Sequence, residues 1–154
     1  MWVRVPSTAP TFPMSKWTAE DFAPQKGVGA VIKNKEGKVL IQKHKKLEKW
    51  SLPGGKGKPH ELAWDILVRE VREECGITIT RATCVVDNVV DVVRDEIEMT
   101  VPLYVFEVHG YTGEIANLEP DKHTIQEFMD PFELKAKGEP LTHSIELWLK
   151  TQNK

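Results

Sequence analysis

Apolar residues along this chain fall into short runs that are typical of β-strands. Two runs, Val28–Ile32 and Lys38–Gln42, are joined by the turn-rich sequence KNKEG and predict the first two strands. Two longer runs, Arg81–Val93 and Ile97–Val108, flank the polar sequence RDE and predict a β-hairpin. Further along, the sequence IQEFMDPFEL predicts a short strand that runs into a turn. The pattern therefore indicates a sheet of several strands.

The apolar pattern changes to a helical period in two places. Glu61–Cys75 has helical spacing, and Gly76 is a natural stop because glycine tolerates the left-handed conformation that ends many helices. The sequence LTHSIELWLK also has this spacing and predicts a last helix that packs into the core. Its core-facing residues are Leu141, Ile145, Trp148 and Leu149. One helix between strands and another at the end predict an α/β domain with a mixed sheet flanked by helices.

Length and proline distribution predict one domain preceded by a tail. A chain of 154 residues suits one compact domain with a sizeable core. Pro6, Pro10 and Pro13 lie among serine and threonine residues, which is a composition typical of unstructured segments. We therefore predict a flexible N-terminal extension over residues 1–24 and a single domain over residues 25–154.

Composition narrows the class of protein. Apolar residues make up 40% and charged residues 29% of the chain, as in ordinary soluble domains. The formal net charge of −2 gives no basic bias, so no stable nucleic-acid partner is expected. No apolar run approaches the roughly 20 residues that a membrane helix needs. Cys75 and Cys84 lack CxxC spacing, which favours free thiols in a reducing cytoplasm.

The predicted helix over Glu61–Cys75 carries acidic residues in an unfavourable place. At about 100° per residue, Leu67 and Val71 form the centre of its apolar stripe, and Glu70 and Glu74 lie on the margin of that stripe. Two like charges four residues apart repel each other by roughly 0.2–0.5 kcal/mol. The last turn of a helix also disfavours anions. A cation should therefore neutralise these carboxylates.

Two interpretations of that cation remain open from the helix alone. Arg69 reaches Glu73 at a spacing of four residues, which suits a plain surface network of charges. The glycine-rich sequence PGGKGK before the helix favours a metal ion instead, because a loop carbonyl and several carboxylates form an all-oxygen set of donors. Hard cations such as Mg²⁺ prefer those donors, whereas zinc usually takes His or Cys ligands.

The whole segment resembles the Nudix box, G-x5-E-x7-R-E-U-x-E-E-x-G-U, in which U is a bulky aliphatic residue. Every position of the pattern is filled. The matching residues are Gly55, Glu61, Arg69, Glu70, Val71, Glu73, Glu74, Gly76 and Ile77. The resemblance implies a Nudix-type α/β/α sandwich with a mixed β-sheet. It also implies hydrolysis of a nucleoside diphosphate linked to another moiety, with Mg²⁺ or Mn²⁺ as cofactor.

The resemblance also implies roles for individual residues. The metal would be held by Glu70, Glu73 and Glu74, with the carbonyl of Gly54 and the loop residue Glu119 as further ligands. Glu70 is the candidate to hold or deprotonate the attacking water, and Glu73 shares this catalytic cluster. Arg69 would orient the glutamates, and Glu61 would act through metal-bound water or shape the loop, with a plain helix-start carboxylate as the alternative. Lys43 and Lys56 are candidates to contact the nucleotide phosphates.

Substrate class is inferred partly from absences. The region DVVRDEIE, after the box, has neither the proline of ADP-ribose hydrolases nor the tyrosine of diadenosine polyphosphate hydrolases. The chain thus resembles the MutT-like group, which converts a (deoxy)nucleoside triphosphate to the monophosphate and pyrophosphate. Hydrolysis of another substrate such as ADP-ribose is the alternative, followed by an inactive binding module and by RNA 5′-end processing. We expect a cytoplasmic monomer or homodimer that acts on a small nucleotide.

Overall fold

A computed structural model describes residues 25–58, 60–94 and 96–152 of the chain. The predicted extension over residues 1–24 lies outside the described residues. The described segments form seven strands and three helices. These are β1 (Gly27–Val31), β2 (Val39–His44), β3 (Lys49–Ser51), β4 (Gly54–Lys56), α2 (Ala63–Cys75), β5 (Thr78–Arg94), β6 (Ile97–Thr112), β7 (His123–Met129), α3 (Pro131–Ala136) and α4 (His143–Gln152).

The strands form two sheets. The larger has the order β4-β1-β6-β5, and the smaller has the order β3-β2-β7. In the larger sheet β1 pairs in parallel with β6, from Gly27 opposite Leu103 to Val31 opposite Glu107, while β4 and β5 pair antiparallel with their neighbours. The prediction of a mixed sheet is therefore confirmed, as is the hairpin of β5 and β6.

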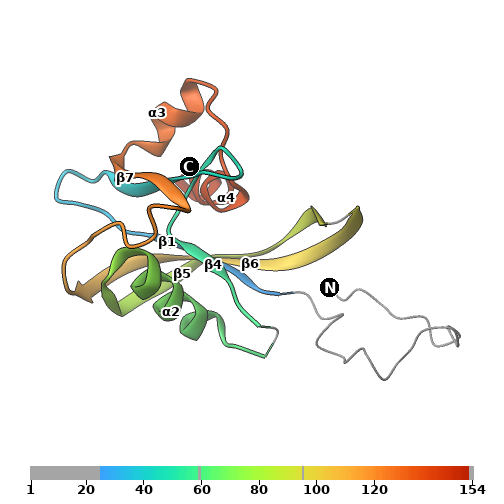
Figure 1. Ribbon diagram of the computed structural model, residues 1–154, viewed down its shortest axis with the longest axis horizontal. Helices are drawn as coiled ribbons and strands as arrows, with labels where there is room; N and C mark the ends of the chain where they lie inside the picture. The colour runs from blue at the N-terminus through green and yellow to red at the C-terminus, as the bar shows by residue number, and fades with distance from the viewer. Residues whose placement is uncertain (1–24, 59, 95, 153–154) are drawn as a thin grey trace, which may run out of the picture.

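Helices cover both faces of the larger sheet, as Figure 1 shows: α2 lies on one side and α3 and α4 lie on the other. Side chains of β1 point alternately to the two faces of the sheet and contribute to both cores. Ala30 packs in the core under α2, while Val31 packs in the core under α4. The predicted stripe of α2 is buried, with Leu67 and Val71 both 0% exposed. This arrangement is the α/β/α sandwich that the sequence predicted.

The structure differs from the predicted elements in several short segments. The strands β3 and β4 were not predicted, because three-residue strands are too short to show a period of two. The turn predicted after β7 is the short helix α3. Its first residue is Pro131, and the side chain of Asp130 accepts a hydrogen bond from the backbone N–H of Phe132. An N-cap aspartate followed by proline at the first position is a helix-start signal.

Two predictions about the chain as a whole concern its thiols and its helices. Cys75 is buried, Cys84 is exposed, and both are free thiols, as predicted. Among the helices of residues 25–58, 60–94 and 96–152, none combines the length and apolar character needed to cross a bilayer.

Candidate active site

Two glycines of β4 bring its backbone against α2. Gly54 has a φ of 153°, and a Cβ at this position would lie 2.0 Å from the carbonyl oxygen of Val28. A Cβ on Gly55 would lie 2.6 Å from the carboxyl carbon of Glu70. Only glycine avoids both overlaps. The glycine-rich sequence therefore forms the edge of the larger sheet and lets the carboxylate of Glu70 lie against the backbone.

Glu74 is the most deeply placed carboxylate of α2, with only 4% of its surface exposed. Its Oε1 accepts hydrogen bonds from the backbone N–H of Gly54 and from Nε2 of Gln42, each at 3.0 Å. Burial nevertheless raises the pKa of Glu74 to about 7, because desolvation of the charged form outweighs these bonds. The sequence placed Glu74 at the margin of the apolar stripe, and the structure buries it further than that.

Arg69 lies among three of the predicted acidic residues. Its Nη1 donates to Oε1 of Glu70 at 2.9 Å and lies 3.8 Å from Oε2 of Glu73. Its Nη2 donates to Oε1 of Glu61 at 3.2 Å. One guanidinium therefore holds three carboxylates from two turns of α2 and from the loop before it.

Glu70 and Glu73 differ in their surroundings. Burial raises the pKa of Glu70, although Arg69 acts against this shift. The side chain of Glu73 is 51% exposed and faces solvent. The two residues thus offer one carboxylate with a raised proton affinity and one that is freely hydrated.

Glu61 makes contacts that organise the loop before α2. Its Oε1 accepts a hydrogen bond from the backbone N–H of Lys58 at 2.8 Å, and this bond is the main reason that its pKa is lowered. Its backbone carbonyl accepts a bond from Nζ of Lys26 at 2.7 Å. Of the roles that the sequence left open, these contacts correspond to shaping the loop.

Glu119 reaches the site because its loop docks on the end of α2. The backbone N–H of Leu118 donates to the carbonyl of Glu74 at 3.0 Å, and that of Ala116 donates to Cys75 at 2.9 Å. These bonds satisfy carbonyls that a helix end leaves open. The negative charge of Glu119 contributes to the raised pKa of Glu74, so the two carboxylates interact. Lys122 pairs with Glu119 at 3.7 Å.

Of the two predicted phosphate contacts, Lys43 lies away from the carboxylates. Lys43 is on the face of β2 opposite to Gln42, where its Nζ lies 4.9 Å from the ring centroid of Trp50. Lys56 is exposed at the end of β4. Besides Arg69, Lys122 also has a positive charge that acts on Glu70. Sequence reasoning missed it, since a lysine in a polar loop carries no distinguishing signal.

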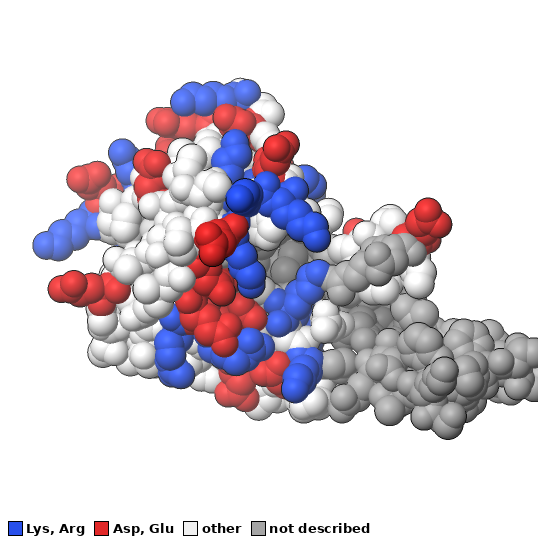
Figure 2. Space-filling view, viewed as in Figure 1, with Lys and Arg blue, Asp and Glu red and all other residues white. Residues whose placement is uncertain are grey.

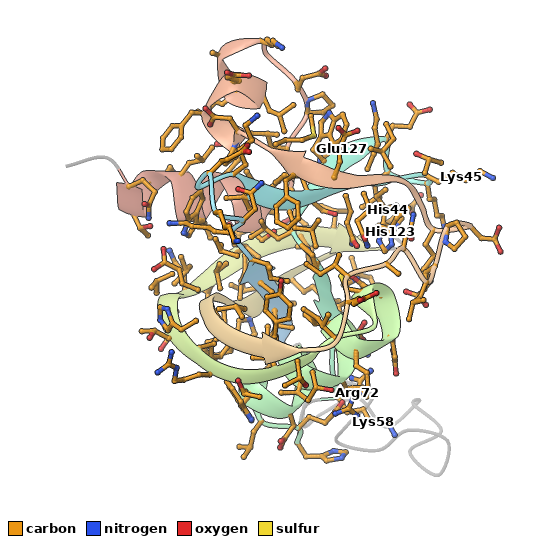
Figure 3. All side chains as sticks on the ribbon, turned by 90° about the vertical axis from the view of Figure 1, so that its left-hand side faces the viewer. His44, Lys45, Lys58, Arg72, His123 and Glu127 are labelled. Carbon is orange, nitrogen blue, oxygen red and sulfur yellow. The ribbon has the colours of Figure 1, made fainter. Side chains whose placement is uncertain are left out.

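A histidine pair lies where β2 and β7 end. The rings of His44 and His123 meet edge to face with their centroids 5.7 Å apart, and Figure 3 shows them side by side. His123 is buried, and burial lowers its pKa to about 4. The positive charge of Lys122 also helps to lower the pKa of both histidines. Neither residue was singled out from the sequence.

The donor chemistry of the site suits a hard divalent cation. Figure 2 shows acidic side chains gathered over α2 with lysine and arginine side chains around them. Among the described residues, no three His, Cys, Asp or Glu side chains lie close enough together to enclose an ion on their own. Mg²⁺ does not require such a cage, because it retains waters and is commonly held by one or two carboxylates together with substrate phosphates. The carboxylates present therefore fit Mg²⁺ or Mn²⁺.

Most of the chain matches a known protein family and solved structures of that family. A family model described as NUDIX domain matches residues 23–149. The MutT NUDIX hydrolase from Burkholderia pseudomallei is 32% identical, with a TM-score of 0.66 over 83% of this chain and 97% of that one. The E. coli ORF135 protein is 25% identical, with a TM-score of 0.67 over 85% of this chain and 92% of that one.

A curated relative matches a shorter segment. A Bacillus subtilis (strain 168) protein named "Putative 8-oxo-dGTP diphosphatase" is 38% identical over 50 residues, which are 32% of this chain and 34% of that protein. The matched segment thus spans about a third of that relative's length. With a family model that covers most of the chain and a fold shared along nearly the whole of a solved MutT protein, this chain belongs to the NUDIX domain family, within which it is similar to hydrolases of the MutT type.

Proposed function

We propose that this Nudix hydrolase converts a (deoxy)nucleoside triphosphate and water to the nucleoside monophosphate and pyrophosphate. The observation that carries the proposal is the packing of Glu70 and Glu74 against the glycine backbone of β4, with Arg69 tying Glu70 to its acidic neighbours. The similarity to MutT hydrolases supports the same reaction.

Divalent metal is the proposed cofactor, as Mg²⁺ or Mn²⁺. Its proposed ligands are drawn from the side chains of Glu70, Glu73, Glu74 and Glu119 and the carbonyl oxygen of Gly54, with Glu70 holding the attacking water instead where it acts as the base. Because no three of the described carboxylates lie close enough to enclose an ion, one or two of them would hold it together with substrate phosphates and water. When bound, such an ion neutralises charge on the phosphoryl oxygens and lowers the pKa of water. Without it, an acidic site of this kind repels a polyphosphate. The residues of the chain therefore bind the cation and orient the water, and the positive charge of the cation attracts the polyphosphate.

Within this scheme Glu70 is the proposed residue that takes a proton from the attacking water. Its raised pKa makes it a better proton acceptor than an ordinary carboxylate. Arg69 holds Glu70 through the 2.9 Å bond to Oε1, so one oxygen is fixed and the other remains for the water. Lys122 is placed to attract the anionic substrate, while Lys43 and Lys56 stay predictions for phosphate contact.

The substrate range is proposed from two sources. The name of the Bacillus subtilis relative concerns 8-oxo-dGTP, which makes oxidised purine triphosphates the first substrates to test. The ordinary triphosphates form the second set, as expected from the MutT resemblance. The proposed setting is the cytoplasm, consistent with two free thiols, and the proposed oligomeric state is a monomer or homodimer.

A product assay tests the proposal. The full chain is incubated with 8-oxo-dGTP, the common triphosphates and ADP-ribose, with Mg²⁺ or with EDTA, and products are separated by ion-exchange chromatography. We expect monophosphate and pyrophosphate in the presence of Mg²⁺ only. AMP and ribose phosphate from ADP-ribose as the main products would contradict the substrate class, and no pyrophosphate from any triphosphate would contradict the reaction.

A further inference from the structure

A fully buried amide lies behind the carboxylate of Glu74. Gln42 is 0% exposed and lies on the same face of β2 as the core residue Leu40, which is 1% exposed. A buried amide costs free energy unless its polar atoms find partners. An apolar side chain could fill the same space without needing hydrogen-bond partners. Packing alone therefore does not explain why this residue is an amide.

The side chain of Gln42 bonds to Glu74 on one side and to Gln126 and Cys75 on the other. Its Nε2 donates to Oε1 of Glu74 at 3.0 Å, and its Oε1 accepts from Nε2 of Gln126 at 2.9 Å. The thiol of Cys75 also donates to this Oε1, at 3.7 Å. Gln42 and Gln126 are directly opposite each other in the antiparallel pairing of β2 and β7. Cross-strand pairing therefore supplies the partner on the same face.

These bonds fix which way the amide of Gln42 points. Gln126 and Cys75 both donate to its oxygen, so its NH₂ group must face Glu74. The opposite orientation would bring a carbonyl oxygen against a carboxylate, which can only accept hydrogen bonds. The network thus presents a donor to Glu74 in one orientation.

As a result, the two carboxylate oxygens of Glu74 differ in their hydrogen bonding. In the segments that the structure describes, the hydrogen bonds to this side chain go to Oε1, from Gln42 and from the backbone of Gly54. The other oxygen, Oε2, is left without such a bond and remains for an external ligand. Two donors on one oxygen also hold the carboxylate plane in place.

We infer that Gln42 is a positioning residue, backed by Gln126 and Cys75, that holds Glu74 by one oxygen so that the other is presented to the divalent cation. The inference rests on the proposed function, because it assumes that Glu74 is a metal ligand. Partners behind a metal ligand typically change metal affinity or activity by about 10–100-fold when removed.

Metal binding by the substrate-free protein tests this role directly. Mn²⁺ is titrated into the full chain and followed by electron paramagnetic resonance, for the wild type and for Gln42→Leu. We expect Gln42→Leu to bind Mn²⁺ about tenfold more weakly. In activity assays its Mn²⁺ activation constant should rise by about as much, while KM for the triphosphate at saturating Mn²⁺ stays within about twofold. The matched control is Ile41→Val, a buried change on the other face of the same strand, which should leave Mn²⁺ affinity unchanged.

A second variant keeps the test decisive if Gln42→Leu does not fold. Gln126→Leu removes a donor to Gln42 without touching Glu74, and it should weaken Mn²⁺ binding by about threefold, below the range seen for direct partners of a ligand. Wild-type Mn²⁺ affinity in either folded variant overturns the inference, as does a wild-type protein that binds no Mn²⁺. If the wild type binds Mn²⁺, Gln42→Leu binds it weakly and no triphosphate is hydrolysed, the positioning role stands and only the proposed reaction fails.

Discussion

The backbone N–H of Gly54 donates a hydrogen bond of 3.0 Å to the carboxylate of Glu74, twenty residues later in the chain. This bond ties β4 to the last turn of α2. It also places a carboxylate against a backbone that carries no side chain to shield it. The glycine-rich strand and the acidic helix are therefore joined directly at the carboxylate site.

Replacement of Glu74 by glutamine tests the proposed metal site. Glu74→Gln keeps the size of the side chain and an oxygen that accepts from Gly54, but it removes a negative charge. We expect Mg²⁺-dependent turnover to fall by about 100-fold or more. The metal-free fold should be as stable as the wild type or more stable, because the substitution removes a desolvated charge. Steady-state kinetics and urea denaturation check both parts, and full activity would contradict the metal-ligand role.

The stability of the metal-free protein should depend on pH through the same residue. The pKa of Glu74 is raised to about 7, above the value of about 4.3 in an unfolded chain. Its protonated form therefore stabilises the fold at low pH, and this contribution is lost as pH rises through about 7. The difference is about 3–4 kcal/mol. In EDTA, the free energy of unfolding of Glu74→Gln relative to that of the wild type should rise as pH goes from about 4.3 to about 7, because only the wild type loses this contribution.

Much of the fold was predictable because its signals are local. Gly76 adopts the left-handed conformation, with a φ of 74°, as its place after the last periodic residue indicated. The helix itself starts at Ala63 rather than at Glu61, because Glu61 accepts a bond from the backbone of the preceding loop. β3 and β4 have no local signal, since they exist through pairing with strands that lie elsewhere in the chain.

Local spacing predicted the site residues that share α2 and its adjoining loop, whereas Glu119 was proposed from the family resemblance alone. The spacing of the box gives Glu61, Arg69 and Glu70, and the structure brings these together. Gln42 and Gln126 come from two strands whose pairing no short pattern specifies. A polar residue at an inward position of a predicted apolar strand was the only available sign. Alternation along β2 also directs Lys43 away from the carboxylates, which depends on the register of the strand.

Alanine at Gly55 should separate activity from folding. Its Cβ would lie 2.6 Å from the carboxyl carbon of Glu70, the far end of a flexible side chain that can move away. We expect kcat for Gly55→Ala to fall by about 100-fold, since a shift of about 1 Å in a catalytic group costs that much. The free energy of unfolding should change by less than about 1 kcal/mol.

Alanine at Gly54 gives the contrast to Gly55→Ala. There the Cβ would lie 2.0 Å from a backbone oxygen of Val28, which cannot move aside cheaply. We expect Gly54→Ala to lose more than about 3 kcal/mol of stability in urea denaturation. Equal losses of stability in the two variants would contradict this distinction between a clash with the movable side chain of Glu70 and a clash with the backbone.

The guanidinium of Arg69 should matter for its shape as well as its charge. Arg69→Lys keeps the charge but loses the fork that holds Glu61 and Glu70 through separate nitrogens. We expect kcat to fall by about tenfold or more with little change in KM for the triphosphate. Arg72→Lys on the same helix is the matched control, because within the described residues Arg72 forms no ion pair with Glu61, Glu70 or Glu73. An equal loss in both variants would contradict a specific role for Arg69.

The buried ring of His123 should make the fold sensitive to acid. Its pKa is lowered to about 4, chiefly by desolvation, from about 6.5 in an unfolded chain. The unfolded state therefore binds a proton first, and stability present above pH 6.5 is lost as pH falls toward 4, by about 3–4 kcal/mol. Glu74 acts in the opposite direction over part of this range, so the two effects partly cancel in the wild type. Urea denaturation in EDTA should show a steeper loss of stability in acid for Glu74→Gln than for the double variant that adds His123→Phe, which keeps an aromatic ring against His44. If the free energy of unfolding depends on pH in the same way in acid with and without His123, the proposed role of this residue is wrong.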